Sequence, residues 1–154
     1  MRPAQRSTAL TFAAAAALAL GVTPAAHADP TFHTTTFPLT SVGVGSTVTG
    51  SVIDIHTQGV RIYAQERYTL RGAVPGTTYA VNLTAYLDPA CTALVVALDG
   101  SPTATANRAG NASARRTFPP PPPPFTLLYL RWTVTELVGG KVVAQTDCVP
   151  VALD

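Results

Sequence analysis

Alternating apolar and polar positions predict that this chain folds into short β-strands. The clearest pattern lies in residues 70–87, where every second residue from position 79 onward is apolar and most of the residues between are polar. A period of two is that of a strand with one buried face. Just before this run, Pro75 and Gly76 favour a type II turn, because proline pre-sets the first turn dihedral and glycine accepts the positive one. The stretch therefore predicts two strands joined as a hairpin.

The residues before this hairpin carry weaker patterns. Residues 29–46 predict an extended N-terminal segment, with at most a short strand at 34–37. Residues 47–56 predict a strand whose apolar positions change parity, which indicates a β-bulge near Val52. Another short strand, at 60–64, is expected to run almost directly into the first strand of the hairpin.

Three further features follow the hairpin. Residues 93–98 form a continuous apolar run, which is typical of an interior strand. Residues 103–106 and 112–118 predict the arms of a small hairpin around the Asn- and Gly-containing turn 107–111. The six consecutive prolines at 119–124 cannot donate to a strand ladder, so we expect a polyproline II connection there.

A C-terminal hairpin is predicted from the alternation in residues 128–134 and from the two glycines at 139–140. A two-residue loop would place Trp132 opposite Asp147, whereas a three-residue loop would place it opposite Cys148. We favour the second register, because it sets the single tryptophan beside a cysteine in the core, as in immunoglobulin domains.

These elements together predict an all-β protein. About eight short strands are separated by glycines and prolines, and no helical period occurs after residue 28. We expect a single immunoglobulin-like β-sandwich over residues 47–154, with residues 119–124 as its polyproline connection.

The first residues have the pattern of a secretory signal. Arg2 and Arg6 precede an apolar run at 9–22, which is followed by a small-residue triplet ending at Ala28. We predict a signal peptide at 1–28 that is cleaved after Ala28. Because the apolar run is shorter than the about 20 residues that a membrane span needs, we expect an extracellular protein with no membrane span after cleavage.

Charge restricts the expected partners. The chain has 10 basic and 8 acidic residues, and removal of Arg2 and Arg6 leaves the mature part without net formal charge. Nucleic acids and anionic membrane surfaces bind concentrated positive charge, so we do not expect nucleic acid as a partner. We expect instead a monomer that binds an unidentified extracellular or cell-envelope partner. The alanine- and arginine-rich composition with one lysine, Lys141, is typical of a GC-rich bacterium.

Both cysteines, Cys91 and Cys148, lie in the part predicted to be exported. An oxidising compartment favours a disulfide between them. The alternative is a reactive or metal-binding thiol pair, but the chain has neither a CxxC spacing nor a histidine close to either cysteine.

Two resemblances support the fold prediction. Residues 74–81, VPGTTYAV, resemble the turn and tyrosine-corner strand of fibronectin type III modules. Residues 66–154 are similar to a group of small exported actinobacterial proteins of uncharacterised function. The shared features are the strand at 72–79, Cys91, the segment 105–111, Trp132 and the ending at 148–154. This resemblance implies a β fold and transfers no activity and no site residues.

Few residues have the chemistry of a catalytic or metal site. His33 and His56 are the histidines that remain after cleavage, and Asp54 shares one strand face with His56. We interpret Asp54 and His56 as polar residues on a solvated face, since a zinc site needs three or four ligands. The G-x-S-x-G, H-E-x-x-H and S-x-x-K motifs are absent. A Ser/His/Asp set assembled across loops stays open as an alternative.

Other polar residues fall in predicted loops or at sheet edges. Four of them carry oxygen atoms of the kind that calcium prefers, but are interpreted as turn formers: Asp88, Asp99, Asn107 and Asn111. Arg115 and Arg116 are adjacent, so one guanidinium must lie on each face of the strand. One of them therefore needs a sheet edge, a loop or a carboxylate partner.

We therefore predict a secreted, non-enzymatic binding or structural domain without cofactor or metal. One alternative is an extracellular enzyme or enzyme inhibitor that uses loop residues around Asp88, Asp99 and Arg108. Another is a cell-envelope adhesion module that acts through the prolines at 119–124.

Overall fold

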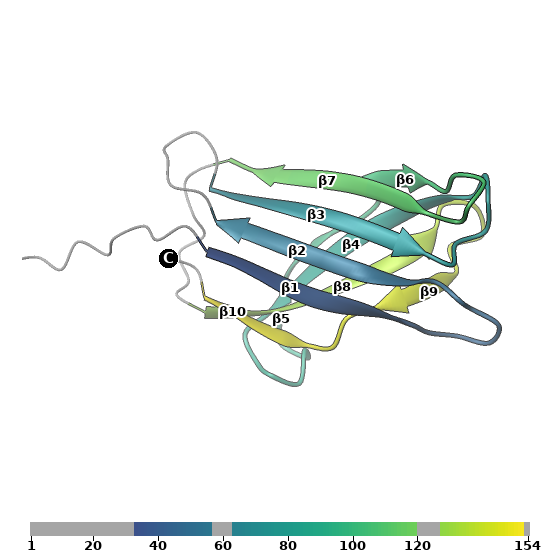
Figure 1. Ribbon diagram of the computed structural model, residues 1–154. Helices are drawn as coiled ribbons and strands as arrows, with labels where there is room; N and C mark the ends of the chain where they lie inside the picture. The colour runs from purple at the N-terminus through teal and green to yellow at the C-terminus, as the bar shows by residue number, and fades with distance from the viewer. Residues whose placement is uncertain (1–32, 57–62, 120–126, 153–154) are drawn as a thin grey trace, which may run out of the picture.

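The computed structural model describes residues 33–56, 63–119 and 127–152. Within these residues ten antiparallel strands form one curled sheet without any helix (Figure 1), which confirms the predicted all-β class. The strands are β1 (His33–Ser41), β2 (Thr49–His56), β3 (Ala64–Arg71), β4 (Thr78–Tyr86), β5 (Leu94–Leu98), β6 (Thr103–Thr105), β7 (Ala112–Phe118), β8 (Leu127–Glu136), β9 (Val142–Gln145) and β10 (Val149–Ala152).

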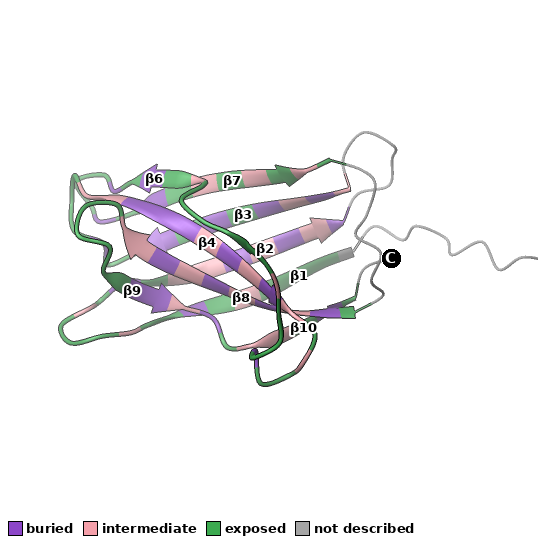
Figure 2. Ribbon diagram, turned by 180° about the vertical axis from the view of Figure 1, so that it is seen from behind, coloured by how far each residue is buried: buried purple, intermediate pink, exposed green. Residues whose placement is uncertain are grey.

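The strand order along the sheet is β5-β4-β8-β9-β1-β2-β3-β7, with β6 added to β4 and β10 added to β8. β1 joins two parts of the sheet, because its residues 33–39 pair with β2 whereas Thr40 and Ser41 pair with β9. We call β1, β2, β3 and β7 the β3 half, and β4, β5, β6, β8, β9 and β10 the β4 half. Figures 1 and 2 show that the sheet curls until the two halves face each other.

The core lies between the halves, and Trp132 of β8 is at its centre. Its side chain is 0% exposed and stacks on Phe37 of β1 with the ring centroids 5.2 Å apart. Its Nε1 donates a hydrogen bond of 2.9 Å to Glu66 Oε1 on β3. At about 25 cal/mol per Å², burial of the roughly 200 Å² of an indole contributes on the order of 5 kcal/mol. Trp132 thus links the two halves.

The predicted hairpin in residues 70–87 is wrong. β3 pairs with β2 and β7, whereas β4 pairs with β5, β6 and β8, so these successive strands belong to opposite halves. The connection crosses the core as an arch, in which Val74 N donates to the Tyr79 hydroxyl at 2.9 Å and Gly76 N donates to Ala106 O at 2.9 Å. The predicted turn itself forms, because Thr77 N donates to Val74 O at 3.1 Å, but it joins strands of opposite halves and not a two-stranded ladder.

The small hairpin predicted at 103–106 and 112–118 is wrong for the same reason. β6 pairs with β4, and β7 pairs with β3. The turn between them does form, because Gly110 N donates to Asn107 O and Asn107 N donates to Asn111 O, both at 2.9 Å. It is a second arch that joins the two halves.

β2 contains no bulge. Its ladders with β1 and β3 continue without a register shift. The change of apolar parity arises because Asp54 and His56 face the interior together with Val52, while Ile53 and Ile55 are half-buried on the outer face. The assignment of Asp54 and His56 to a solvated face is therefore wrong.

β5 is an edge strand and not the interior strand expected from its apolar run. It pairs with β4 alone, and Leu94, Val96 and Leu98 are exposed. A continuous apolar run cannot by itself distinguish a strand buried on both faces from an edge strand that lines the mouth of a cavity.

The C-terminal register differs from both alternatives. Trp132 lies opposite Thr146, with mutual bonds from Thr146 N to Trp132 O (3.0 Å) and from Trp132 N to Thr146 Oγ1 (3.1 Å). The register of the ladder shifts between Val134 and Thr135 of β8, because Val143 of β9 is an extra residue in the ladder, which the simple loop count does not include. The predicted disulfide between Cys91 and Cys148 is confirmed.

The core begins before residue 47. β1 lies within the segment expected to be extended, and its Phe37 and Leu39 pack inside the sheet.

Three predicted features lie outside the described residues: the signal peptide at 1–28, most of the strand at 60–64 and prolines 120–124. None of the described residues forms a helix that could cross a membrane.

Candidate functional site

A cavity of about 240 Å³ lies inside the curled sheet, between the inner faces of its two halves. Both sheet edges contribute to it, with Val96 and Leu98 from β5 and Phe118 from β7. Most of the other side chains that line it are apolar. The complete lining is Asp54, His56, Tyr63, Ala64, Glu66, Leu83, Ala85, Val96, Leu98, Phe118, Pro119, Leu128, Leu130 and Val151. An apolar cavity with a few converging polar groups is the usual form of a small-molecule site.

Glu66 supplies the most unusual polar group of the cavity. It belongs to the inward face of β3, and the residue is 1% exposed. Trp132 Nε1 donates 2.9 Å to Oε1, and the Tyr68 hydroxyl donates to Oε2. Burial, and secondly the negative charge of Asp54, raise the pKa of Glu66 to about 8, although Arg116 and the Trp132 hydrogen bond act in the opposite direction.

Arg116 links the two edges of the sheet. It projects inward from β7, and its Nη2 donates 2.9 Å to Val81 O on β4, with Leu98 O of β5 3.5 Å away. Its Nη1 lies 3.9 Å from Glu66 Oε2 and forms no hydrogen bond within the described residues. Burial lowers the pKa of Arg116, while the carboxylates of Glu66 and Asp99 oppose this shift. Of the environments expected for one of the adjacent arginines, a sheet edge, a loop or a carboxylate partner, Arg116 has both an edge strand and the Glu66 carboxylate.

Asp54 and His56 form a second polar pair in the cavity wall. They are only 5% and 7% exposed, and His56 Nε2 lies 3.2 Å from Asp54 Oδ2. The His56 ring meets the Tyr63 ring edge-on, with centroids 5.2 Å apart. His33 begins β1 opposite His56 in the ladder. The structure therefore brings Asp54, His56 and Glu66 together around one cavity.

The loop residues weighed as ligands serve their own loops. The Asp88 carboxylate accepts hydrogen bonds from the backbone N–H groups of Ala90, Thr92 and Ala93, which lower the pKa of Asp88, the bond from Ala93 most strongly. Asn107 Oδ1 likewise accepts from Ala109 N and Asn111 N.

These loops do not build the cavity, since Asp88, Asp99 and Arg108 are all outside its lining. In the part of the chain that the structure describes, no group of three histidine, cysteine or acidic residues could hold a metal ion.

Glu66 was not predicted, because the alternation was assigned to residues 70–87 and to a separate strand at 60–64, whereas β3 runs from Ala64 to Arg71. Extending the inward parity of Tyr68 and Leu70 backward places Glu66 and Ala64 on the buried face. An acidic residue at a position that strand alternation assigns to the buried face is unusual, and this is the signal by which Glu66 could have been identified. Comparison with protein-family models, curated proteins and solved structures finds no match for this chain.

Proposed function

We propose that this protein is a secreted, non-enzymatic domain that binds a small, mainly apolar molecule carrying an amine. The observation that carries the proposal is the buried Glu66 carboxyl in the wall of an apolar cavity. Its neighbours compensate only in part for the burial of its charge, which is why its pKa is raised to about 8. Because this carboxyl group lines the cavity, it can contact a ligand that binds there.

Electrostatics favour an amine over an acid. Two carboxyl groups, Asp54 and Glu66, line the cavity, whereas Arg116, whose guanidinium is directed to Val81 O and Leu98 O, is not part of the lining. A ligand ammonium beside Glu66 would favour its ionised form, so that binding at neutral pH displaces the proton that the raised pKa retains. Apolar walls would take the remainder of the ligand.

The sandwich fold and the secretion that the sequence predicts fit this proposal. We regard the curled sheet as an immunoglobulin-like sandwich, supported by the facing of β3 and β8 through Glu66 and Trp132. Secretion after cleavage at Ala28 is supported by the signal-like N-terminal pattern and by a disulfide, which persists in oxidising compartments.

Three probes of similar shape test the cavity: phenethylamine, phenethyl alcohol and phenylpropionate. We expect phenethylamine to raise the melting temperature saturably, the alcohol to raise it less, and the carboxylate to have the smallest effect. Glu66→Gln should remove the preference for the amine over the alcohol. Asp147→Asn, which neutralises an exposed carboxylate outside the cavity, is the matched control and should retain the preference.

A second variant tests the position of the ligand. Ala85 is buried in the cavity wall, so Ala85→Leu would extend a side chain into the cavity and should abolish the phenethylamine response while the protein remains folded. An unchanged response in Ala85→Leu, or equal responses to amine and carboxylate, would contradict the proposal.

Acid–base catalysis is a second candidate function, favoured by the raised pKa of Glu66 and by its closeness to the Asp54–His56 pair. Turnover by the purified mature chain on a hydrolase panel, lost in both Glu66→Gln and His56→Asn, would favour the enzyme. Saturable binding without turnover would favour the binding domain.

A further inference from the structure

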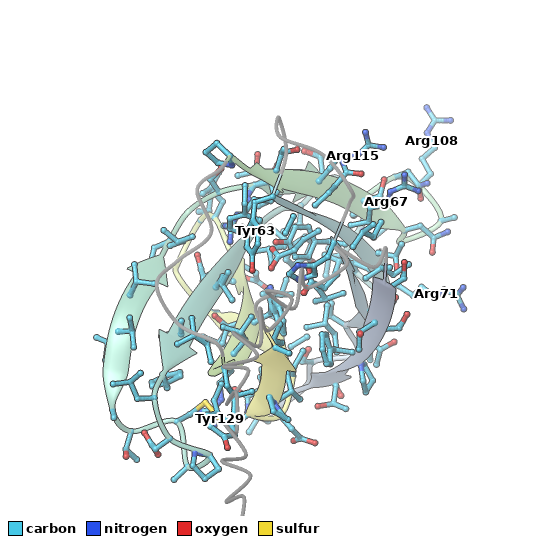
Figure 3. All side chains as sticks on the ribbon, turned by 90° about the vertical axis from the view of Figure 1, so that its left-hand side faces the viewer. Tyr63, Arg67, Arg71, Arg108, Arg115 and Tyr129 are labelled. Carbon is cyan, nitrogen blue, oxygen red and sulfur yellow. A yellow bond between two sulfur atoms is a disulfide. The ribbon has the colours of Figure 1, made fainter. Side chains whose placement is uncertain are left out.

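Positive charge gathers on the outer face of the β3 half, opposite to the cavity. Arg67 and Arg71 of β3, Arg115 of β7 and Arg108 in the preceding loop are all exposed. Figure 3 shows these four side chains on one outer side of the molecule, pointing away from the core. The predicted mature chain has no net formal charge, yet four of its arginines lie together on this one face.

This outer face contains no carboxylate among the described residues. The side chains that point outward are Thr34, Thr36, Pro38, Thr49, Ser51, Ile53, Ile55, Gln65, Arg67, Thr69, Arg71, Ser113, Arg115 and Thr117. The acidic residues of the same strands, Asp54 and Glu66, point inward. The arginines on this face consequently have no acidic neighbour on it.

Arg67 and Arg115 are directly opposite each other in the ladder between β3 and β7. Like charges at directly opposed positions destabilise a sheet. Arg71 lies four residues further along β3 on the same face, a rise of about 13 Å. An anionic partner that neutralises all three arginines would remove this repulsion.

The face is also hollowed around Thr69. Three shallow depressions share this residue: one reaches Asn107 and Ser113, one reaches Arg67 and Arg115, and one reaches Ser51 and Arg71. Hydroxyl groups thus alternate with guanidinium groups along a continuous strip, which we call the arginine strip (Ser51, Arg67, Thr69, Arg71, Ser113 and Arg115).

We propose that the arginine strip binds an extended acidic polysaccharide. Guanidinium groups bind carboxylates through paired N–H donors, and serine and threonine hydroxyls suit the hydroxyls of sugar rings. Single-stranded nucleic acid is less well matched, because base stacking needs aromatic side chains and none of the described outward-facing residues of this half is aromatic.

The test measures binding of the mature chain to immobilised polygalacturonate, a polymer of uronates, at low and at physiological salt. We expect saturable binding that weakens as salt rises, since surface charges are screened. Arg67→Gln/Arg115→Gln should weaken it at least about tenfold, because two of the guanidinium groups are removed. Lys141→Gln removes an exposed cation from the turn between β8 and β9 and should leave binding unchanged.

The contradicting outcomes are distinct. Equal loss in Lys141→Gln and in the double variant would show non-specific attraction and overturn the proposal. Equal or tighter binding to oligothymidylate or to anionic vesicles would assign the strip to another partner.

Because both arginines are exposed and mutually repulsive, the double variant is expected to melt no lower than the parent, which a melting curve checks. The proposal is independent of the cavity, so Glu66→Gln should leave binding to polygalacturonate unchanged.

Discussion

Glu66 has the most consequential environment of any single residue in this fold. Its carboxyl group is fully enclosed, yet it accepts hydrogen bonds from Trp132 and Tyr68 and faces Arg116 and Asp54. Removing a charge from water costs several kcal/mol unless neighbouring groups compensate for it. The neighbours compensate only in part, so the protonated form is favoured up to a pH of about 8.

Stability should therefore depend on pH through Glu66. Its pKa in the folded protein, about 8, is above its ordinary value of 4.5, so the folded state binds the proton more tightly than the unfolded state. The stabilisation is complete below about pH 4.5 and is lost as the pH rises through 8. The free energy of unfolding should fall by on the order of 4 kcal/mol from pH 5 to pH 8, as about 1.4 kcal/mol per pKa unit implies.

Chemical denaturation across this pH range measures the effect, and Glu66→Gln should reduce the slope. Asp147→Asn, at an exposed position, should retain it. Asp54, His56 and Arg116 face the same region, so the difference between parent and variant isolates the contribution of Glu66. A parent protein whose stability rises from pH 5 to pH 8 would contradict the assignment.

At the residue scale, sequence reasoning identified the right residue types in the wrong environments. Asp54 and His56 were recognised as sharing one face, but polarity assigned that face to solvent. Glu66 lies directly opposite Asp54 on the next strand, β3, whereas the apolar cavity residues of β4, Leu83 and Ala85, are distant in sequence. A single strand does not reveal that a polar residue will meet such partners inside the fold.

At the element scale, the connections determine how the sheet curls. Gly72 begins the arch between β3 and β4 with a φ of 66°, and its carbonyl accepts a hydrogen bond of 2.8 Å from Thr47 Oγ1. Gly76, in the same arch, has a φ of 79° but no atom within 4 Å of an added Cβ. At Gly72 an added Cβ would collide with the backbone carbonyl of Thr47.

The two glycines provide a matched pair of substitutions. Gly76→Ala should cost only the left-handed dihedral, about 1–2 kcal/mol. Gly72→Ala should cost about 3 kcal/mol or more, because the same dihedral cost is combined with a backbone collision. Urea denaturation of both variants checks the difference. Equal costs would show that the arch shifts freely away from Thr47.

The strands themselves could be predicted from alternation, but not their neighbours. The period of two located the strand that became β4 and most of the one that became β8. The turns at Pro75–Gly76 and 107–111 were also recognised, yet both connect strands of opposite halves. A turn signal shows where the chain reverses, whereas pairing depends on which distant strand covers each apolar face.

At the scale of the whole molecule, β3 presents different chemistry on its two faces. Glu66 points into the cavity, while Arg67 and Arg71 point to the arginine strip. A strand places successive side chains on opposite faces, so one strand can serve two separate sites. The cavity depends on both halves of the sheet, whereas the arginine strip lies on the β3 half alone.

The disulfide distinguishes these two sites. Cys91 lies between β4 and β5, and Cys148 lies between β9 and β10. The bond therefore restrains the elements that carry Val96, Leu98 and Val151 of the cavity wall. The two cysteines are 57 residues apart, and closing a loop of this length stabilises a fold by about 4 kcal/mol in the chain-entropy model.

Cys91→Ala/Cys148→Ala should thus lower the free energy of unfolding by about 2–5 kcal/mol, as measured by denaturation. At a temperature where the variant is still folded, its phenethylamine response should weaken, because β5 and β10 lose their common restraint. Its affinity for polygalacturonate should remain, since no residue of the arginine strip lies on the β4 half. Parallel loss of both affinities in the folded variant would mean that the two faces of β3 are coupled through the core.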